Sequence, residues 1–288
     1  RALLHTLIPP NVVGRLATHA GPEMLGSEIA LCTVMFCSLE PQAVLRATAT
    51  EAALELLDAV FSAFDAAVKR AGMYKYQHVG EWYIVACPRA SSPFDDAEQA
   101  GEYPDRYAAA MVRLSLELIA VAAGFRTGAG PDGGDPMWLR VGVACGPAAG
   151  AVIGTLRAFY CLYGDTVNTA ARMCKYAAPG RIHCTEAFAA RAGPACAGLA
   201  RAEDRGISEI KGKGPMRTFE LLPDAPAPAN GALSHGLSYG GLSHDLRHGL
   251  SVRVDDGLLG YAGGPLAQEE APGQMPATLS RIAQAGEP

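Results

Sequence analysis

The sequence of 288 residues predicts an α+β sandwich of the ferredoxin type. Its β-prone runs and amphipathic helices follow the order strand, helix, hairpin, helix, strand, helix, strand, which suits that sandwich better than a doubly wound parallel sheet. Hydrophobic residues make up 49% of the chain and charged residues 18%. This composition supports a buried core and excludes a wholly disordered chain, a collagen-like repeat and a coiled coil.

We expect three regions along the chain. Residues 1–24 form a lead-in helix or linker, whose apolar residues recur at helical spacing and whose helix is broken at Pro9 and Pro10. Residues 25–222 form the folded domain, and residues 223–288 form a low-complexity tail whose imperfect Gly-Leu-Ser repeat predicts disorder. The spacing of the tail histidines suits no fixed metal geometry, which favours a solvated linker; these are His235, His244 and His248.

The first half of the domain carries a strand, a helix and a hairpin. Ile29–Cys37 is a continuous β-prone apolar run, typical of a strand buried in a sheet. Glu51–Arg70 predicts an amphipathic helix that lies on the sheet, and Tyr74–Cys87 predicts a β-hairpin that turns at Gly80. The expected buried stripe of the helix consists of Leu54, Leu57, Phe61 and Phe64.

The second half begins with another helix, at Tyr107–Gly124. Leu139–Pro147 predicts a strand, after which residues 148–155 form a small, glycine-rich stretch that we interpret as a turn. The expected closing strands are Arg181–Thr185 and Arg217–Leu222.

A strand near Tyr160 passes through Gly164 directly into a third helix. The residues just after the glycine have the short polar side chains that favour helix N-caps, so we expect Asp165 or Thr166 to cap this helix.

Charge and cysteine content exclude several classes of protein. The formal net charge of -5 leaves no basic surplus to neutralise a phosphate backbone, so we expect no nucleic-acid binding. The eight cysteines never form a CxxC pair and lie in apolar stretches, which predicts reduced, buried thiols. No run of about 18 apolar residues is present, and the sequence begins at Arg1. We therefore expect a cytoplasmic domain cut from a longer protein, whose remainder is free to include membrane spans or a sensor.

Two motifs resemble the signature of the class III nucleotide cyclase catalytic domain. They are Tyr160–Met173 (YCLYGDTVNTAARM) and Leu139–Pro147 (LRVGVACGP), the latter followed by Gly150–Thr155 (GAVIGT). The resemblance extends upstream through Tyr74–Tyr83 to the lead-in segment, and downstream to the Lys-Gly-Lys-Gly of Arg205–Gly214. It covers most of residues 1–222, apart from residues 88–106 and 127–136, and it implies the ferredoxin-like cyclase fold, which functions as a dimer.

The resemblance also implies a reaction. In these enzymes the ribose 3′ oxygen of GTP or ATP attacks the α-phosphate and pyrophosphate leaves, so catalysis rests on positioning and charge stabilisation. Two Mg²⁺ or Mn²⁺ ions are held by two aspartates of one domain. The second domain supplies the residues that read the purine and stabilise the transition state, so a second cyclase domain is the implied partner.

The purine and transition-state half is largely intact by this comparison. Asn168 and Arg172 match the ribose-orienting asparagine and the phosphate-stabilising arginine of the family, and four residues apart on a helix they share a face. The alternative, a helix cap and a solvated arginine, is favoured for an isolated pair and disfavoured within this signature. Lys211 and Lys213 resemble the lysine that contacts the triphosphate, and the sequence leaves open which of the two does so.

The two base-reading positions favour guanine. Cys161 stands where guanylate cyclases tend to have cysteine, and Gln77 stands where they have glutamate and adenylate cyclases have lysine. Glutamine keeps one acceptor oxygen for the guanine donors but lacks the charge, which weakens discrimination against ATP. A plain buried thiol remains the alternative for Cys161.

The metal half departs from the family pattern. Ser38 stands in place of the first aspartate, and a neutral hydroxyl is a poor ligand for Mg²⁺. Glu40 and Pro41 add a negative charge and remove an amide donor in the following loop. Glu81 replaces the second aspartate with a longer side chain, so it is at most a weak metal ligand.

Four interpretations follow from this asymmetry. The favoured one is half of a heterodimeric or tandem cyclase, with cGMP favoured over cAMP. Its rival is a catalytically inactive pseudo-cyclase that dimerises with an active cyclase and regulates it. The other two are a weak homodimer that uses Glu81 alone, with Mn²⁺ as a tolerant ion, and an α+β ligand-binding domain that shares only the fold.

Overall fold

The computed structural model describes residues 8–18, 25–40, 50–126, 134, 136–154 and 158–224. The expected tail with its three histidines lies outside the described residues, as do Pro41 and residues 1–7. No helix in the described part of the chain is long and apolar enough to cross a membrane.

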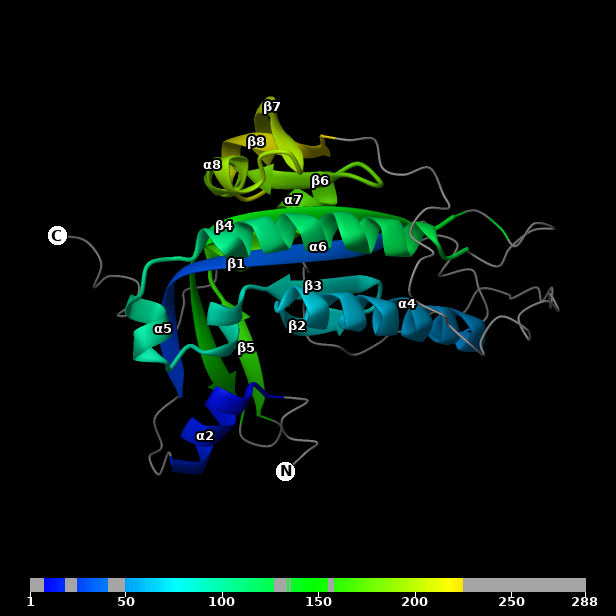
Figure 1. Ribbon diagram of the computed structural model, residues 1–288. Helices are drawn as coiled ribbons and strands as arrows, with labels where there is room; N and C mark the ends of the chain where they lie inside the picture. Colours follow the sequence, from blue (N-terminus) through cyan, green and yellow to red (C-terminus); the bar gives the residue numbers. More distant parts are fainter. Residues whose placement is uncertain are drawn as a thin grey trace. The chain divides into compact units, whose positions relative to one another are not determined.

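One mixed sheet organises the described residues (Figure 1). Its strands are β1 (Gly26–Glu40), β2 (Tyr74–Val79), β3 (Trp82–Ala86), β4 (Trp138–Ile153), β5 (Phe159–Tyr163), β6 (Ile182–Thr185), β7 (Ala200–Ile210) and β8 (Gly214–Pro223). Seven of them follow the order β2-β3-β1-β4-β6-β8-β7, and β5 pairs with the far part of β4. β6 runs parallel to β4, whereas β1 pairs antiparallel with both β3 and β4. The predicted α+β fold is confirmed.

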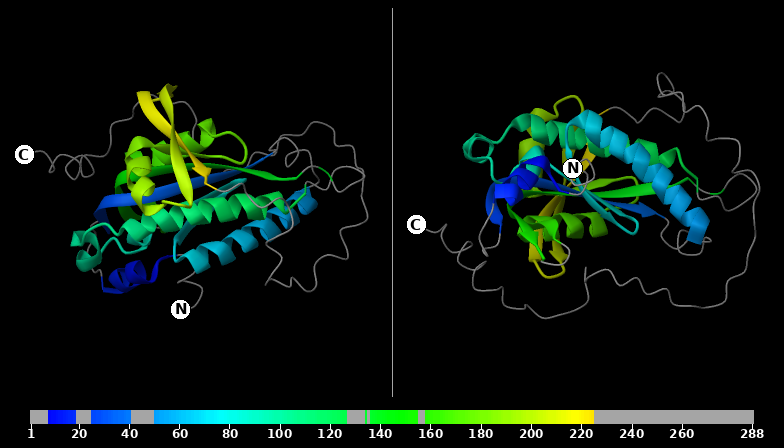
Figure 2. Two further views of the ribbon diagram at one scale, coloured as in Figure 1. Left: turned by 45° about the horizontal axis from the view of Figure 1, so that its top comes forward. Right: turned by 90° about the horizontal axis from the view of Figure 1, so that it is seen from below.

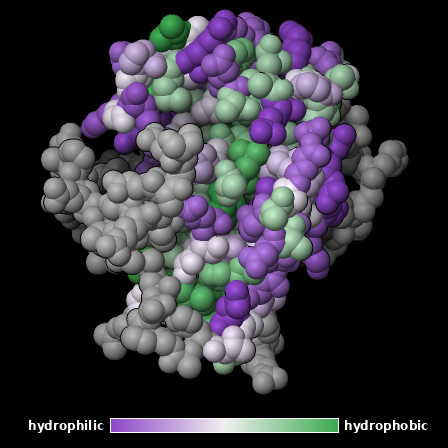
Figure 3. Space-filling view, turned by 90° about the vertical axis from the view of Figure 1, so that its left-hand side faces the viewer, coloured by the Kyte–Doolittle hydropathy of each residue, from purple (hydrophilic) through white to green (hydrophobic). Residues whose placement is uncertain are grey.

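The helices cover both faces of this sheet. α4 (Thr50–Ala71), α6 (Asp105–Ala123) and α8 (Glu186–Ala195) share one apolar core with alternate residues of β1, such as Met35 and Leu39. α7 (Asp165–Tyr176) lies on the other face, where Val34 and Phe36 of β1 are buried in a second core. The right-hand view of Figure 2 shows the sheet between these two layers. Polar side chains dominate the face in Figure 3, where apolar side chains form a narrow central strip.

One detail of the predicted helices is wrong. Leu54 is 57% exposed, because the core that α4 covers begins one turn later, with Leu57 packed against it and Phe61 within it. The helix expected before Pro9 and Pro10 falls mostly on residues 1–7, which lie outside the described residues, and a helix not expected there, α2 (Pro10–Thr18), begins at Pro10. Proline suits the first turn of a helix, since its missing amide hydrogen has no partner there in any case.

The glycine-rich stretch after residue 147 is a strand and not a turn. β4 continues to Ile153 and pairs with β5. A Cβ atom at Gly150 would lie 2.2 Å from the hydroxyl of Tyr160, so the missing side chain makes room for the tyrosine of the neighbouring strand. The sequence analysis also missed α8 and β7.

Gly142 sets the distance between α7 and the sheet. A Cβ atom there would lie 1.9 Å from the backbone nitrogen of Cys174 and 2.5 Å from the carbonyl oxygen of Ala170. Both atoms belong to the α7 backbone, so the helix rests directly on β4.

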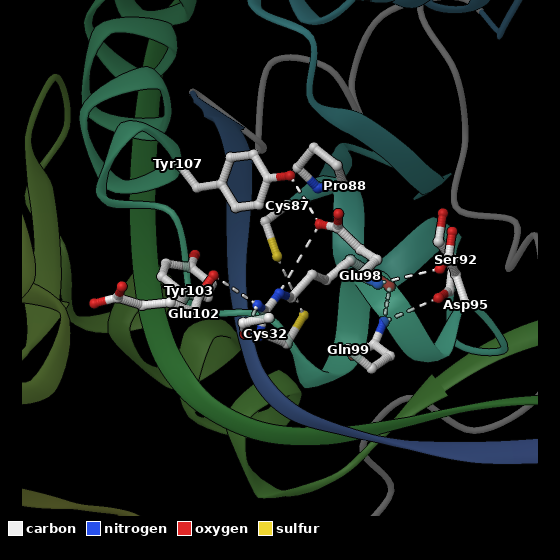
Figure 4. A network of polar contacts seen from close by, with 12 residues as sticks. Cys32, Cys87, Pro88, Ser92, Asp95, Glu98, Gln99, Glu102, Tyr103 and Tyr107 are labelled. Atoms are coloured by element: carbon white, nitrogen blue, oxygen red, sulfur yellow. Dashed lines mark hydrogen bonds and ion pairs between the residues drawn. The ribbon is translucent and has the colours of Figure 1, made fainter.

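Residues 88–106, which the family resemblance did not cover, fold around the buried side chain of Arg89. Figure 4 shows the polar network of this segment, with Glu98, Gln99 and Tyr103 among the labelled residues. They include η1 (Pro88–Ser91) and α5 (Asp96–Ala100). Arg89 is 3% exposed, and its Nη2 atom donates to the carbonyl oxygens of Gly101 and Glu102, at 2.5 and 2.9 Å. Its guanidinium group lies 5.4 Å from the ring centre of Tyr103, whose hydroxyl contacts Thr33 Oγ1 of β1 at 2.5 Å. This network anchors the segment to the sheet.

Replacing Arg89 by methionine keeps most of the buried side-chain volume but removes the donors that bind the carbonyl groups of Gly101 and Glu102. We expect Arg89→Met to lower the free energy of unfolding by about 3 kcal/mol, because hydrogen bonds from charged groups are worth about 1.5–3 kcal/mol each. Urea denaturation followed by circular dichroism measures this. Arg106, exposed and stacked on Tyr107, provides the control, and an equal loss in Arg106→Met would contradict the buried role of Arg89.

Gly142→Ala forces α7 away from β4. We expect a loss of at least about 2 kcal/mol in the free energy of unfolding, since the clash involves backbone atoms and not a flexible side chain. Gly193→Ala in α8 is the matched control, because a Cβ atom there meets open space and alanine favours helices. Similar melting curves for the two variants would refute the close approach of α7.

Candidate functional site

Helix α7 exposes a polar stripe made of Asp165, Asn168 and Arg172. The helix starts directly after β5 at Gly164, whose φ of +127° favours glycine. The opposite side of α7 rests on β4, so Asn168 is exposed and Arg172 is half-buried at the edge of the helix. The spacing of three and four residues places the three side chains on one face.

The turn between β7 and β8 lies against both ends of α7. The ammonium group of Lys213 forms an ion pair with the carboxylate of Asp165, and its side chain is only 16% exposed. The backbone amide of Lys211 donates to the hydroxyl of Tyr176 at the last residue of the helix, at 3.4 Å. The fold therefore brings Lys213 to the stripe that carries Asn168 and Arg172.

Neither residue proposed as the N-cap of α7 serves as one. The cap residue is Gly164, without a side-chain hydrogen bond. Thr166 Oγ1 donates to the carbonyl oxygen of Pro147 at 2.6 Å, and Asp165 is paired with Lys213. The sequence analysis thus missed the contact of Asp165, because an aspartate that follows a glycine before a helix matches the capping pattern equally well.

The base-reading positions lie on β2 and β5, two strands that do not pair. Gln77 and Cys161 are both half-buried, and Cys161 differs in this from the other seven cysteines, which are all buried. The backbone amide of Leu162 donates to the hydroxyl of Tyr76 at 3.0 Å. This bond joins the residues next to Gln77 and Cys161, so the fold brings the two positions close. Tyr76 carried no signal in the sequence analysis.

The fold also brings Ser38 and Glu81 together. Ser38 of β1 pairs with Trp82 of β3, and the amide of Leu39 donates to the carbonyl oxygen of Glu81 at 3.2 Å. The two positions that match the metal-binding aspartates of the family are therefore neighbours.

The residues around Ser38 do not fit a two-metal site. Ser38 is 2% exposed and offers a hydroxyl group, and its partner on β4 is Arg140. The Nε atom of Arg140 lies 3.0 Å from the carboxylate of Glu40, so this nearby carboxylate is already paired with a fixed cation. Among the described residues, no group of three or more His, Cys, Asp and Glu side chains is arranged to hold a metal ion.

The arrangement is suited to an anionic ligand. Asn168 offers amide donors, Arg172 a planar guanidinium group and Lys213 an ammonium group, all on one side of α7. Groups of these kinds donate hydrogen bonds to phosphate oxygens and stabilise negative charge in the protonation state that they have at neutral pH. Cys161, and with it Gln77, lies near this group of donors, since β5 leads directly into α7.

Comparisons with known proteins identify the family of the chain. The family model of the adenylate and guanylate cyclase catalytic domain matches residues 27–223, which is more than half of the chain. Atrial natriuretic peptide receptor 2 of Bos taurus is 31% identical over 229 residues, which are 79% of this chain and 20% of the receptor. The chain thus spans about a fifth of the length of that relative.

Two solved structures share the fold. The guanylate cyclase domain of RhGC from Catenaria anguillulae, in complex with GTP, is 28% identical with a TM-score of 0.57, over 68% of this chain and 98% of that domain. A dimeric guanylyl cyclase domain of the RhoGC fusion protein from Blastocladiella emersonii is 25% identical with a TM-score of 0.55, over the same shares of both chains. The chain belongs to the adenylate and guanylate cyclase catalytic domain family.

Proposed function

We propose that this chain is the purine-reading and transition-state half of a nucleotide cyclase site, which a second cyclase domain completes. The observation that carries the proposal is the contrast between the two halves. Asn168, Arg172 and Lys213 lie together on one side of α7, whereas Ser38 lies beside the ion pair of Arg140 with Glu40. The family uses Mg²⁺ or Mn²⁺, and in this proposal the ligands of the ions come mostly from the partner, with Glu81 at most a weak contributor.

The residues of this chain act on the nucleotide in separate ways. The ribose 3′ hydroxyl gives up its proton to water, and its oxygen forms a bond to the α-phosphorus while the bond to the leaving pyrophosphate breaks. The Asn168 amide orients the ribose, and the Arg172 guanidinium group donates to the oxygens on which negative charge accumulates. Its permanent charge means that no proton has to move before it acts. Lys213 binds the oxygens of the leaving pyrophosphate, for which it must exchange its contact with Asp165.

GTP is the proposed substrate, with cGMP and pyrophosphate as products. The side-chain oxygen of Gln77 accepts a hydrogen bond from a guanine donor, and Cys161 contacts the same base from β5. The half-exposed thiol of Cys161 supports this role over that of a core residue. Because Gln77 carries no charge, ATP is rejected less strongly than by a glutamate.

The partner is a second cyclase domain, as a heterodimer or a tandem domain. Large apolar side chains are exposed on β5, namely Phe159 and Tyr163, and at the hairpin, namely Val79. Exposed aromatic residues are common at protein interfaces. One structure of the RhoGC domain that shares the fold is a non-canonical dimer, which supports association with a second domain.

A catalytically inactive pseudo-cyclase is the second candidate. The pairing of Glu40 with Arg140 beside Ser38 favours it, because this ion pair would also suit a domain that no longer binds metal ions. In that case the chain would dimerise with an active cyclase and regulate it.

A mixing experiment separates the two candidates. The full chain is combined with a guanylyl cyclase domain that keeps both metal-binding aspartates but has lost its own transition-state arginine, so that only the mixed site is complete. We expect cGMP formation from GTP in the mixture alone, and at least about a hundredfold loss with Arg172→Ala. Arg201→Ala, which changes an exposed arginine of β7, is the control. If a mixture that sediments as a dimer formed no cGMP, this result would establish the pseudo-cyclase.

The same mixture distinguishes the two lysines. We expect Lys213→Ala to raise the KM for GTP about tenfold or more, because a charge-assisted hydrogen bond to phosphate is worth roughly 1.5–3 kcal/mol. Lys211→Ala should change it less than about twofold, because it is Lys213 whose ammonium group reaches the start of the stripe. The opposite order of effects would assign the triphosphate to Lys211.

A further inference from the structure

Strand β2 contains a β-bulge at Tyr76. Lys75 pairs with Val85 and Gln77 pairs with Ile84, so Tyr76 is an extra residue without a partner in the ladder. In a regular strand Lys75 and Gln77 would share a face. The bulge instead places Gln77 on the face of Ile84, which belongs to the core beneath α7, while Lys75 contacts Asp65 of α4. An irregular strand therefore sets the face of the proposed base-reading residue.

The hydroxyl of the bulged tyrosine reaches a different strand. It accepts a hydrogen bond from the backbone amide of Leu162 at 3.0 Å, between residues 86 positions apart in the sequence. Among the described strands β5 pairs with β4 alone, so its other side is an edge of the sheet. An amide of an edge strand needs a partner from outside the sheet or from water, and here a side chain of β2 supplies it.

Neighbouring rings hold Tyr76 in place. The ring of Tyr74 lies 6.5 Å from that of Tyr76 and 6.4 Å from that of Tyr160 on β5. Burial raises the pKa of Tyr76 to about 12, so the phenol is neutral at physiological pH and its oxygen remains an acceptor next to the amide. The aromatic contacts and the hydrogen bond join β2 to β5 beside Gln77 and Cys161.

We propose that Tyr76 is a positioning residue for purine recognition, which fixes the separation of Gln77 and Cys161 through its bond to the Leu162 amide. The inference rests on the proposed function, which assigns those two residues to the base. A purine held from two strands meets both partners only if the strands keep their spacing, because hydrogen bonds weaken steeply outside about 2.7–3.2 Å. Loss of the hydrogen bond between Tyr76 and the Leu162 amide therefore lowers the selectivity for guanine over adenine more than it lowers the affinity for either nucleotide.

The test uses Tyr76→Phe in the full chain, which removes one oxygen and keeps the ring. Equilibrium dialysis with radiolabelled 3′-deoxy-GTP and 3′-deoxy-ATP, which lack the attacking oxygen and are not turned over, in the presence of the metal-competent partner domain, gives the two dissociation constants and their ratio. We expect the preference for GTP to fall roughly threefold to tenfold, the range that corresponds to one hydrogen bond. We also expect faster hydrogen exchange at the Leu162 amide.

Tyr107→Phe is the matched control, since it removes a tyrosine hydroxyl that donates to Glu98 at 2.9 Å in the network around Arg89. It should leave the ratio unchanged. An unchanged ratio in Tyr76→Phe, with Gln77→Ala shifting it, would overturn the role of Tyr76 and leave the proposed function standing. An unchanged rate of hydrogen exchange at the Leu162 amide would refute the hydrogen bond between this amide and Tyr76. If the unmodified chain bound neither nucleotide, the proposed function would fail, and this inference with it.

Discussion

Helix α7 and strand β4 meet at the level of their backbones, and the candidate site depends on that contact. No side chain fits at Gly142, where the helix backbone occupies the space of a Cβ atom. The helix is therefore held at one distance from the sheet. Its first turn follows β5 without a loop, and the turn between β7 and β8 touches both of its ends. Asn168 and Arg172 are thus placed by main-chain packing, which is far less adaptable than the packing of side chains.

The two halves of the site differ in how their charges are balanced. At the start of α7, Lys213 is paired with Asp165, a carboxylate on the first turn of the same helix that carries Arg172. Near Ser38, Arg140 is paired with Glu40 on the neighbouring strand. The first pair leaves Arg172 available for an anion, whereas the second places a permanent cation where a divalent ion would need anionic oxygens. This balance of charges supports the proposed role of the chain in binding the phosphates of a nucleotide, with the metal ions held by a partner.

Local sequence patterns predicted the elements that have a regular pattern. The stripe of α4 and the hairpin turn at Gly80 were visible because periodicity and turn chemistry are local properties. α8 was missed because its sequence is rich in alanine and glycine and lacks a clear apolar stripe, and β7 because most of its residues are exposed and polar. The family motifs identified the candidate site residues. The bond between Tyr76 and Leu162 had no sequence signal, since it joins residues 86 positions apart on strands that do not pair.

The bulge in β2 also affects how related sequences are to be aligned. If the extra residue, Tyr76, were deleted, Lys75 and Gln77 would become neighbours in a regular strand and would keep their present partners, Val85 and Ile84. Gln77 would stay on its face, but the side chain that binds the Leu162 amide would be lost. The length of the strand therefore decides whether the position of Gln77 carries this link to β5, independently of which amino acid stands there. Two cyclase hairpins are to be compared at this position only after the extra residue has been aligned with a gap.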